Sequence, residues 1–309
     1  MKRFVAWGFV IALLVAAGLS QAADRQDVSH NLEFGGLKRS YLLHLPANAP
    51  AGPLPLVVML HGGMGTGASA AQQSGFDAEA DMHGFIVVYP DGTDRDRPLR
   101  AMMGKQGFLT WNAGSCCGYA QQHDIDDVGF IRAVVADVGK DHPVDPKRIY
   151  ATGMSNGAMM SYRLACEASD LFAAVGPVAG IVEIPDCKPA HPVAVIDFQG
   201  TDDENVPLNG GIGKKEVGKK EDRKPVQYSI DLWVKADGCS VTVKSEHPGI
   251  HLANYGGCQD GTAVDYYVVQ GGGHDWPGGK QMAAFLDKPN PDIPATDLIW
   301  SFFKDHPKP

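Results

Sequence analysis

The sequence predicts an α/β fold with a mostly parallel central sheet, an antiparallel N-terminal hairpin and helices on both faces. Short, nearly continuous apolar runs indicate strands that are buried on both faces, as in a parallel sheet covered by helices. Segments with the 3.6-residue apolar period of helices alternate with these runs. The first strand-like segments instead flank Gly35-Gly36, which is typical of a hairpin.

The elements follow in order along the chain. A hairpin is expected from residues 32–34 and 39–45. Asp126 can cap a helix over residues 127–138, in which valines, phenylalanine and isoleucine form one apolar stripe. The other expected strands are residues 56–60, 85–89, 148–152, 172–178, 193–198 and 264–269, and the other expected helices are residues 158–166, 226–236 and 295–303.

The first 22 residues have the pattern of a secretory signal peptide. Lys2 and Arg3 form a positive region, an apolar stretch follows over residues 4–19, and small residues end at Ala22. We expect cleavage after Ala22, which leaves residues 23–309 as one domain of a secreted or periplasmic protein. An uncleaved membrane anchor is the alternative.

Charge and spacing exclude several classes of function. The formal charge of −9 becomes −11 when Lys2 and Arg3 leave with the leader, and an acidic chain without a basic stripe is a poor nucleic-acid binder. No second apolar run approaches membrane length, so no membrane contact is expected after cleavage. Without Cys-x-x-Cys or His-x-x-x-His spacing, the sequence predicts neither a metal site nor a cofactor.

Six cysteines in an exported chain indicate disulfides. Cys239 and Cys258 could close residues 240–257 as a hairpin-like loop. The remaining four allow three pairings: Cys116, Cys117, Cys166 and Cys187. Cys116 and Cys117 are adjacent and could bond each other only by distorting their shared peptide, so separate partners are equally open.

A lysine-rich segment over residues 208–225 separates the strand 193–198 from the helix 226–236. It repeats Gly-Lys-Lys-Glu at residues 213–216 and 218–221. The pattern lacks the spacing and the Ser or Thr of a phosphate-binding loop. A solvated, mobile loop is therefore expected.

The pentad Gly153-Met154-Ser155-Asn156-Gly157 lies between a predicted strand and a predicted helix. A G-x-S-x-G pentad in this context is the nucleophile elbow of α/β hydrolases, whereas the same pentad elsewhere is mostly an ordinary turn. The flanking glycines permit a turn so sharp that a side chain there would collide with the strand or helix. Ser155 is therefore the candidate nucleophile.

A serine hydroxyl requires a base, and the base requires an orienting acid. Among 11 histidines, His274 is the candidate base because its glycine-rich loop directly follows the last predicted strand. The acid should follow the strand 193–198, where Asp202, Asp203 and Glu204 crowd together. Spacing alone does not separate Asp202 from Asp203.

An oxyanion hole is expected in the loop after residues 56–60, which reads His-Gly-Gly-Met-Gly. The backbone N–H of Gly63 or Met64 would act with that of Asn156, and a plain glycine turn is the alternative. Trp111 and Trp276 are candidate walls of a substrate pocket, with ordinary core packing as an almost equal alternative.

With these motifs the chain resembles the polyhydroxybutyrate depolymerase and feruloyl esterase family of secreted serine esterases. The matching segments are LVVMLHGG, WNAGSCC, DDVGFI, RIYATGMSNGAMMSYRLACE, GT-x-D-x-x-VP, GGGHDWPGG and IWSFF. The resemblance implies an α/β hydrolase fold with Ser155 as nucleophile, His274 as base and Asp203 as acid, because the family's acid precedes x-x-Val-Pro. It also agrees with a disulfide between Cys239 and Cys258.

Two departures from the family pattern stand out. Gln199 occupies a position where the family often has histidine, which affects the polarity near the acid and not the triad. The lysine-rich segment is the other departure, and it lies where it could border the substrate cleft. Secreted depolymerases of insoluble polymer usually carry a linker and a separate binding domain, whereas this sequence stops after its last helix. Soluble esters or short oligomers are therefore the expected substrates.

The resulting hypothesis is a secreted serine carboxylic ester hydrolase with a Ser-His-Asp acyl-enzyme mechanism in one catalytic domain. Its expected substrates are hydroxyalkanoate esters or oligomers of the polyhydroxybutyrate type. Feruloyl or acetyl esters of plant polysaccharides are the alternative. A serine peptidase, or an inactive binding protein on a hydrolase scaffold, is a more distant possibility.

Overall fold

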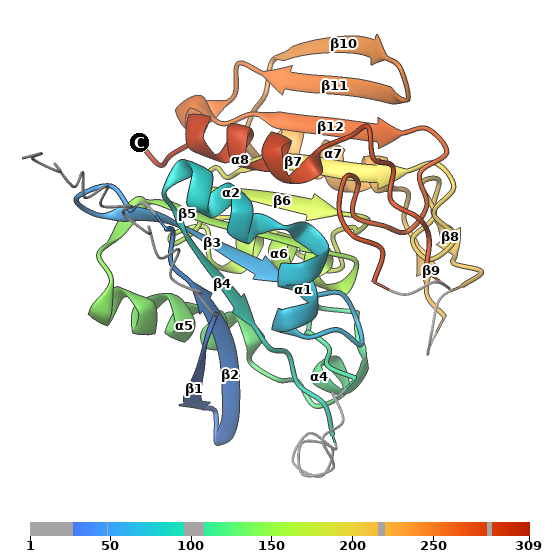
Figure 1. The fold of residues 1–309 in the computed structure, drawn as a ribbon. Helices are drawn as coiled ribbons and strands as arrows, with labels where there is room; N and C mark the ends of the chain where they lie inside the picture. The colour runs from blue at the N-terminus through green and yellow to red at the C-terminus, as the bar shows by residue number, and fades with distance from the viewer. Residues whose placement is uncertain (1–26, 48, 96–107, 216–219, 283–285) are drawn as a thin grey trace, which may run out of the picture.

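The computed structural model describes residues 27–47, 49–95, 108–215, 220–282 and 286–309 (Figure 1). The predicted leader and its cleavage after Ala22 lie outside these residues. No helix in the described ranges is both long and apolar enough to span a membrane.

One ten-stranded sheet organises the described chain, in the order β1-β2-β4-β3-β5-β6-β7-β12-β11-β10. Its strands are β1 (Val28–Phe34), β2 (Leu37–His44), β3 (Leu54–Leu60), β4 (Ile86–Pro90), β5 (Val144–Met154), β6 (Ala174–Val178), β7 (Ala194–Gly200), β10 (Val241–His247), β11 (Ile250–Gly256) and β12 (Val264–Val269). The six central strands, β4-β3-β5-β6-β7-β12 in sheet order, are parallel. At one end of the sheet, β1 and β2 form the antiparallel start that was predicted. The other end, β12-β11-β10, is also antiparallel, and the addition of β10 and β11 to the sheet beside β12 was not predicted.

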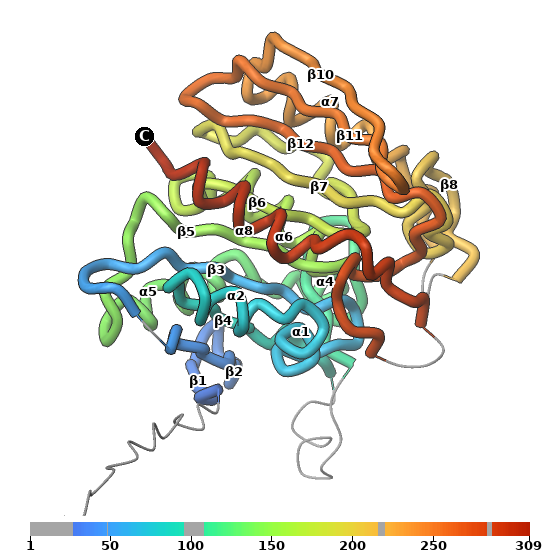
Figure 2. The backbone as a smooth tube through the Cα atoms, turned by 45° about the horizontal axis from the view of Figure 1, so that its top comes forward, coloured from blue at the N-terminus to red at the C-terminus, as the bar shows by residue number. Residues whose placement is uncertain are grey.

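Helices cover both faces of this sheet (Figure 2). They are α1 (Gly67–Ser74), α2 (Phe76–His83), α4 (Gly118–Gln122), α5 (Asp127–Asp141), α6 (Asn156–Glu167), α7 (Val226–Ala236) and α8 (Ala295–Asp305), with a short 3-10 turn at Gln259–Gly261. α1, α2 and α8 lie on one face, while α5, α6 and α7 lie on the other. As predicted, the Asp126 side chain caps α5 by accepting the N–H of Gly129 at 2.8 Å.

The apolar run of β3 shows why the central strands are continuous rather than alternating in pattern. Leu56, Val58 and Leu60 pack into the core on the α5–α6–α7 face. Val57 and Met59 pack into the core on the opposite face, beneath α1, α2 and α8. All five are fully buried, so each side of the strand requires apolar side chains.

The disulfide pairs join Cys116 to Cys117, Cys166 to Cys187 and Cys239 to Cys258. The expected hairpin-like loop between Cys239 and Cys258 is the antiparallel pair β10–β11, in which Val241 faces Gly256. β10 is an edge strand with mostly exposed residues. Its sequence therefore lacks the apolar pattern by which the buried strands were recognised.

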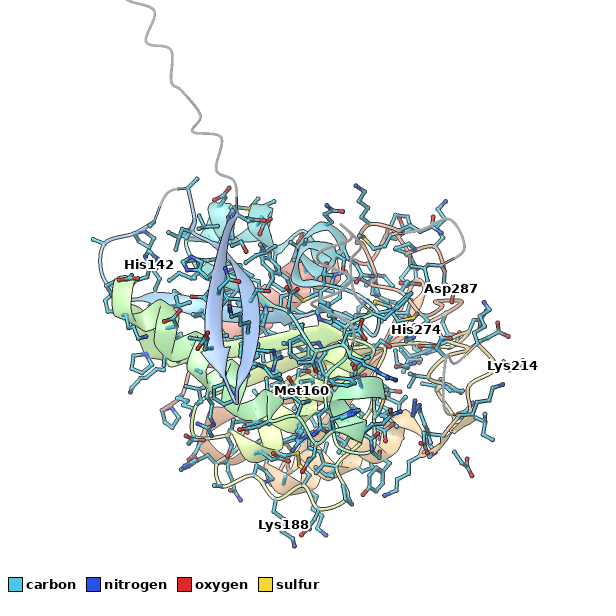
Figure 3. The ribbon with its side chains drawn as sticks, turned by 90° about the horizontal axis from the view of Figure 1, so that it is seen from below. His142, Met160, Lys188, Lys214, His274 and Asp287 are labelled. Atoms are coloured by element: carbon cyan, nitrogen blue, oxygen red, sulfur yellow. A yellow bond between two sulfur atoms is a disulfide. The ribbon has the colours of Figure 1, made fainter. Side chains whose placement is uncertain are left out.

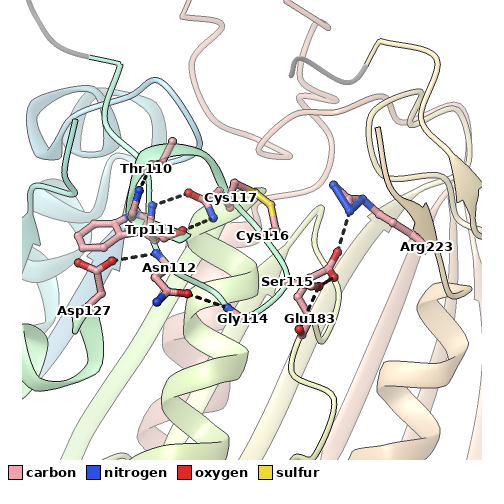
Figure 4. Close-up of a disulfide and its surroundings, with 12 residues drawn as sticks. Thr110, Trp111, Asn112, Gly114, Ser115, Cys116, Cys117, Asp127, Glu183 and Arg223 are labelled. Atoms are coloured by element: carbon pink, nitrogen blue, oxygen red, sulfur yellow. Dashed lines mark hydrogen bonds and ion pairs between the residues drawn. A yellow bond between two sulfur atoms is a disulfide. The ribbon is translucent and has the colours of Figure 1, made fainter. Parts of the chain in front are cut away.

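The described parts of the lysine-rich segment expose Lys214 and Lys215 to solvent, as expected, but they also contain regular structure that was not expected. Two short antiparallel strands, β8 (Gly211–Ile212) and β9 (Asp222–Arg223), lie near its ends. The Arg223 guanidinium forms a buried ion pair with Glu183 at 2.7 Å (Figure 4). This contact anchors the segment to the chain that follows β6.

Candidate active site

Ser155 occupies a strained turn between the last residue of β5 and the first residue of α6. Its φ of 56° and ψ of −119° lie in a region that non-glycine residues rarely adopt. Its N–H donates to the Val178 carbonyl at 2.9 Å, which ties the turn to β6. This backbone is the one expected of a nucleophile elbow.

The glycines on both sides of Ser155 are required by close backbone approach. A Cβ on Gly153 would lie 2.6 Å from the Gly157 carbonyl carbon, and one on Gly157 would lie 2.3 Å from the Leu60 carbonyl oxygen. Both distances are far inside van der Waals contact with main chain that cannot easily move. The pentad is therefore a packing requirement of the β5–α6 junction as well as a motif.

The loops that carry the predicted acid and base leave neighbouring parallel strands, β7 and β12, and are bonded together. The Asp202 N–H donates to the Gly272 carbonyl at 2.9 Å, and the Gly271 N–H donates to the Thr201 hydroxyl at 2.8 Å. A Cβ on Gly200 would lie 2.2 Å from the same Gly272 oxygen, so only glycine permits this approach. The two loops are therefore held together at this edge of the sheet.

At this edge the structure brings Asp203, and not Asp202, to the imidazole of His274. Asp203 Oδ2 lies 2.8 Å from His274 Nδ1, and the acid side chain is fully buried while that of the histidine is 11% exposed. Asp203 Oδ1 accepts the N–H groups of Asn205 and Val206 at 2.8 Å each. Asp202 instead accepts a hydrogen bond from the Thr201 hydroxyl. With Nδ1 held by Asp203, Nε2 remains for proton transfer.

Gln199 supports the acid from behind, a role that the sequence did not reveal. Its side-chain amide donates to Asp203 Oδ2 at 3.0 Å and to the Val206 carbonyl at 2.8 Å, and the residue is buried. The glutamine therefore orients the carboxylate that holds His274. The departure from the family's usual histidine was the only signal in the sequence.

The predicted oxyanion loop packs directly against the elbow. A Cβ on Gly62 would lie 3.7 Å from the Ser155 Cβ, and one on Gly63 would lie 3.8 Å from the Asn156 Cβ. The N–H of Asn156, at the first position of α6, has no acceptor within its helix. This N–H and the Gly63 backbone therefore lie on adjoining segments beside Ser155.

The expectation that Met64 is an alternative oxyanion donor is wrong. Its N–H donates to the Leu109 carbonyl at 2.8 Å, so this donor is already committed to the main chain. Its φ of 67° turns the chain there, and its side chain is exposed. Among the two predicted loop donors, Gly63 is the one that remains.

Trp111 and Trp276 do not wall a substrate pocket, because both are completely buried. Trp111 Nε1 donates to the His61 carbonyl at 3.0 Å, so this ring supports the oxyanion loop from inside. Trp276 Nε1 donates to the Thr296 hydroxyl at 3.0 Å. The core-packing alternative that the sequence left open describes both residues.

A buried ion pair supports the Trp111 segment from the far side. Arg39 Nη2 lies 2.7 Å from Asp127 Oδ1. Asp127 Oδ2 accepts the Asn112 N–H at 2.8 Å (Figure 4). Both charged side chains are almost completely buried. Burial raises the pKa of Asp127, and Arg39 opposes this shift. The pair links β2 and α5 to Asn112, whose neighbour Trp111 contacts the oxyanion loop.

A cavity of about 790 Å³ opens beside the acid and base loops. Its lining includes Asp203, Glu204, Pro207, Lys215, Gly273 and Asp287. The lysine-rich segment therefore borders a hollow at this edge of the sheet, and its place beside the substrate cleft stays a prediction.

The family model described as "Esterase PHB depolymerase" matches residues 39–204, which is more than half of the chain. The chain belongs to this family of esterases. The match ends just after Asp203 and includes the elbow and the oxyanion loop.

Curated relatives agree with this assignment. Feruloyl esterase B of Piromyces equi is 34% identical over 238 residues, which cover 75% of this chain and 41% of that protein. Putative esterase NocK of Nocardia uniformis subsp. tsuyamanensis is 30% identical over 275 residues, covering 83% of this chain and 76% of that protein. Poly(3-hydroxyalkanoate) depolymerase C of Paucimonas lemoignei is 33% identical over 141 residues, covering 44% of this chain and 30% of that protein. The chain thus spans less than half the length of the first and third relatives.

Solved structures show the same fold. An acetyl xylan esterase from Aspergillus awamori superposes with a TM-score of 0.60 at 16% identity, covering 90% of this chain and 99% of that one. An S-formylglutathione hydrolase from Agrobacterium tumefaciens superposes with a TM-score of 0.57 at 15% identity, covering 90% of this chain and 94% of that one. The predicted α/β hydrolase fold is confirmed.

Proposed function

We propose that this esterase acts through a covalent acyl-serine intermediate formed on Ser155. His274 Nε2 takes the hydroxyl proton as Ser155 Oγ attacks the ester carbonyl. Asp203 holds the imidazole by Nδ1 and stabilises the imidazolium that results. The observation that carries the proposal is the 2.8 Å contact between Asp203 and His274, on loops bonded together at the strand end where the elbow also opens.

The tetrahedral intermediate then collapses and releases the alcohol, which receives the proton from His274. Water, deprotonated by the same histidine, attacks the acyl-serine in the second half-reaction, and the acid leaves as Ser155 regains its proton. The backbone N–H groups of Gly63 and Asn156 are the proposed donors to the oxyanion. Each such donor contributes about 3 kcal/mol to transition-state stabilisation in serine hydrolases.

The Ser155 hydroxyl makes no hydrogen bond within the described part of the chain. Catalytic contacts are often long without substrate and tighten in the Michaelis complex. The contact between Ser155 and His274 is therefore expected to form when the ester carbonyl is seated against Gly63 and Asn156.

We propose hydroxyalkanoate esters or short oligomers of the polyhydroxybutyrate type as substrates, which is the chemistry that the family's description names. Feruloyl or acetyl esters of plant polysaccharides are the second candidate. A specific observation favours the second: the match to feruloyl esterase B covers 75% of this chain, whereas the match to the depolymerase covers 44%.

We also propose that the protein is exported. The signal-peptide pattern of residues 1–22 and the three disulfides of the described residues support an oxidising compartment. N-terminal sequencing of the protein from the producing cells should begin at Ala23.

The mechanism is tested with purified wild type and Ser155→Ala. We expect burst kinetics and fluorophosphonate labelling of the wild type only, and ester turnover by Ser155→Ala would overturn the proposal. The substrate is tested with hydroxybutyrate oligomers, methyl ferulate, acetylated xylan and nitrophenyl esters. A higher kcat/KM for the oligomers supports the first candidate, and a higher value for methyl ferulate or acetylated xylan supports the second.

A further inference from the structure

A second carboxylate, outside the proposed triad, accepts a hydrogen bond from the backbone of the proposed base. Asp287 Oδ2 accepts the His274 backbone N–H at 2.9 Å. Figure 3 shows Asp287 and His274 side by side at one edge of the molecule. His274 is therefore held at two points, by Asp203 through the ring and by Asp287 through the backbone.

The sequence at Gly273 makes this second contact possible. A Cβ on Gly273 would lie 2.6 Å from Asp287 Oδ2 and 2.7 Å from the Asp287 Cβ. Only glycine lets the carboxylate reach the following N–H. The Gly-Gly-Gly run before His274 thus permits two close approaches. Gly272 packs against Gly200 of the acid loop, and Gly273 packs against Asp287.

Lys215 of the lysine-rich segment holds the same carboxylate by its other oxygen. Its Nζ lies 3.2 Å from Asp287 Oδ1 and 3.0 Å from Glu204 Oε2. Glu204 directly follows Asp203 in the sequence. The Lys215 ammonium group therefore connects the loop that carries the proposed acid with the carboxylate that contacts the His274 backbone. The His274 hydrogen bond, together with Lys215, holds the pKa of Asp287 below its ordinary value.

We propose that Asp287 is a positioning residue for the esterase reaction. Asp287 fixes the His274 backbone and favours the imidazolium form of the ring, and Lys215 holds Asp287 in place. This inference rests on the proposed role of His274 as base. The imidazolium exists only after His274 takes the serine proton, so a fixed negative charge nearby stabilises the transition state more than the ground state. Lys215 partly offsets that charge, so the two residues act in opposite directions.

The other charged residues that face His274 are present in every variant of the comparison that tests this. Asp203 is bonded to the ring, and Asp275 is the next residue along the chain. Burial raises the pKa of Asp275 to about 6. Neither residue is substituted in the variants below, and Asp287 contributes to the raised pKa of Asp275, so the effect of Asp287→Asn includes its effect on that neighbour.

The test measures the pH dependence of kcat/KM for a nitrophenyl ester in Asp287→Asn and Lys215→Met. The amide keeps an oxygen for the His274 N–H but removes the charge, so the ascending limb should shift down by about 0.5 pH unit. The plateau kcat should fall about fivefold, with KM little changed. Lys215→Met leaves the Asp287 charge unopposed, so its limb should shift up instead. Lys214→Met is the matched control, because Lys214 contacts Glu204 but not Asp287, and its limb should stay in place.

Opposite shifts in the two variants support the proposal, since a merely structural role would lower the rate without moving the limb in either direction. A wild-type limb in both Asp287→Asn and Lys215→Met overturns it. If Asp287→Asn fails to fold, Lys215→Met still decides, because the Lys215 side chain is 55% exposed and its loss disturbs no core. Ser155→Ala is assayed in parallel: turnover in that variant overturns the proposed function itself, whereas an inactive Ser155→Ala confines any failure to Asp287.

Discussion

Asn156 is bound to the main chain of Trp111 through both ends of its side-chain amide. Its Oδ1 accepts the Trp111 N–H at 2.7 Å, and its Nδ2 donates to the Trp111 carbonyl at 3.0 Å. The residue after the nucleophile therefore has two roles, since its backbone N–H is a proposed oxyanion donor while its side chain fixes where that donor lies. Trp111 extends the link to the oxyanion loop through His61.

Replacing Asn156 with alanine should remove both side-chain bonds to Trp111 without removing the backbone N–H donor. The buried Trp111 N–H loses its acceptor, while the Trp111 carbonyl keeps the Cys117 N–H as a donor, so the change should cost about 2 kcal/mol of unfolding free energy. kcat should fall by about tenfold or more while KM changes little, since the oxyanion forms only in the transition state. Asn254→Ala is the control: it removes a side-chain bond to Asp265 near the far end of β12. It should cost stability alone, and an equal loss of kcat in both variants would contradict the role of the Asn156 side chain.

Gly157→Ala should disrupt the junction between β5 and α6. The added methyl would lie 2.3 Å from the Leu60 carbonyl oxygen, and β3 cannot retreat because it is buried on both faces. We expect a loss of more than about 2 kcal/mol in unfolding free energy, measured by denaturant titration. Gly139→Ala, within α5 and with open space around it, should instead stabilise the protein by about 0.5–1 kcal/mol. A similar response in both variants would show that helix propensity, and not close approach, governs Gly157.

The fold could be predicted where local pattern and burial agree. The central strands are apolar because both faces are covered, and β5, α6 and β12 lie where the sequence placed them. The edge strand β10 escaped prediction because its valines and polar residues are exposed and carry no buried face. The antiparallel end of the sheet is thus a tertiary feature that no local periodicity encodes.

The site divides in the same way. Ser155 and His274 could be placed from strand ends and glycines, because those features are local. The hydrogen bond from Met64 to Leu109 joins segments far apart in sequence, so the sequence could not exclude Met64 as a donor. Asp287 follows no strand end and belongs to no motif, and only the folded chain brings it to the His274 backbone.

Gln199 gives a direct test of how the acid is supported. Gln199→Leu keeps the approximate volume but removes both donated hydrogen bonds, so Asp203 should lose orientation and kcat should fall about tenfold. Gln199→His restores a ring N–H donor of the kind common in the family and should recover most of the rate. Thermal unfolding of both variants separates this effect from folding. Equal activity of Gln199→Leu and wild type would exclude a role for the amide in orienting Asp203.

Asp197 should make the protein less stable as the pH rises. Its side chain lies in the core, where the Tyr162 hydroxyl donates to it at 2.8 Å, and burial raises its pKa to about 8. The unfolded carboxyl ionises near its ordinary value of 3.8, so the unfolded state loses its proton first. The stabilisation is complete below pH 3.8 and is lost progressively up to about pH 8, at a limiting slope of about 1.4 kcal/mol per pH unit.

Asp197→Asn removes this titration while keeping an acceptor for the Tyr162 hydroxyl. The unfolding free energy of the variant should therefore decline less than that of the wild type between pH 5 and pH 8. Guanidinium titrations at half-unit steps across that range measure both curves. Asp237, whose pKa is also raised by burial, to about 7, remains in both proteins, so it contributes equally and cancels in the difference. Parallel curves for wild type and Asp197→Asn would mean that Asp197 is ionised in the folded core, with Tyr162 compensating its charge.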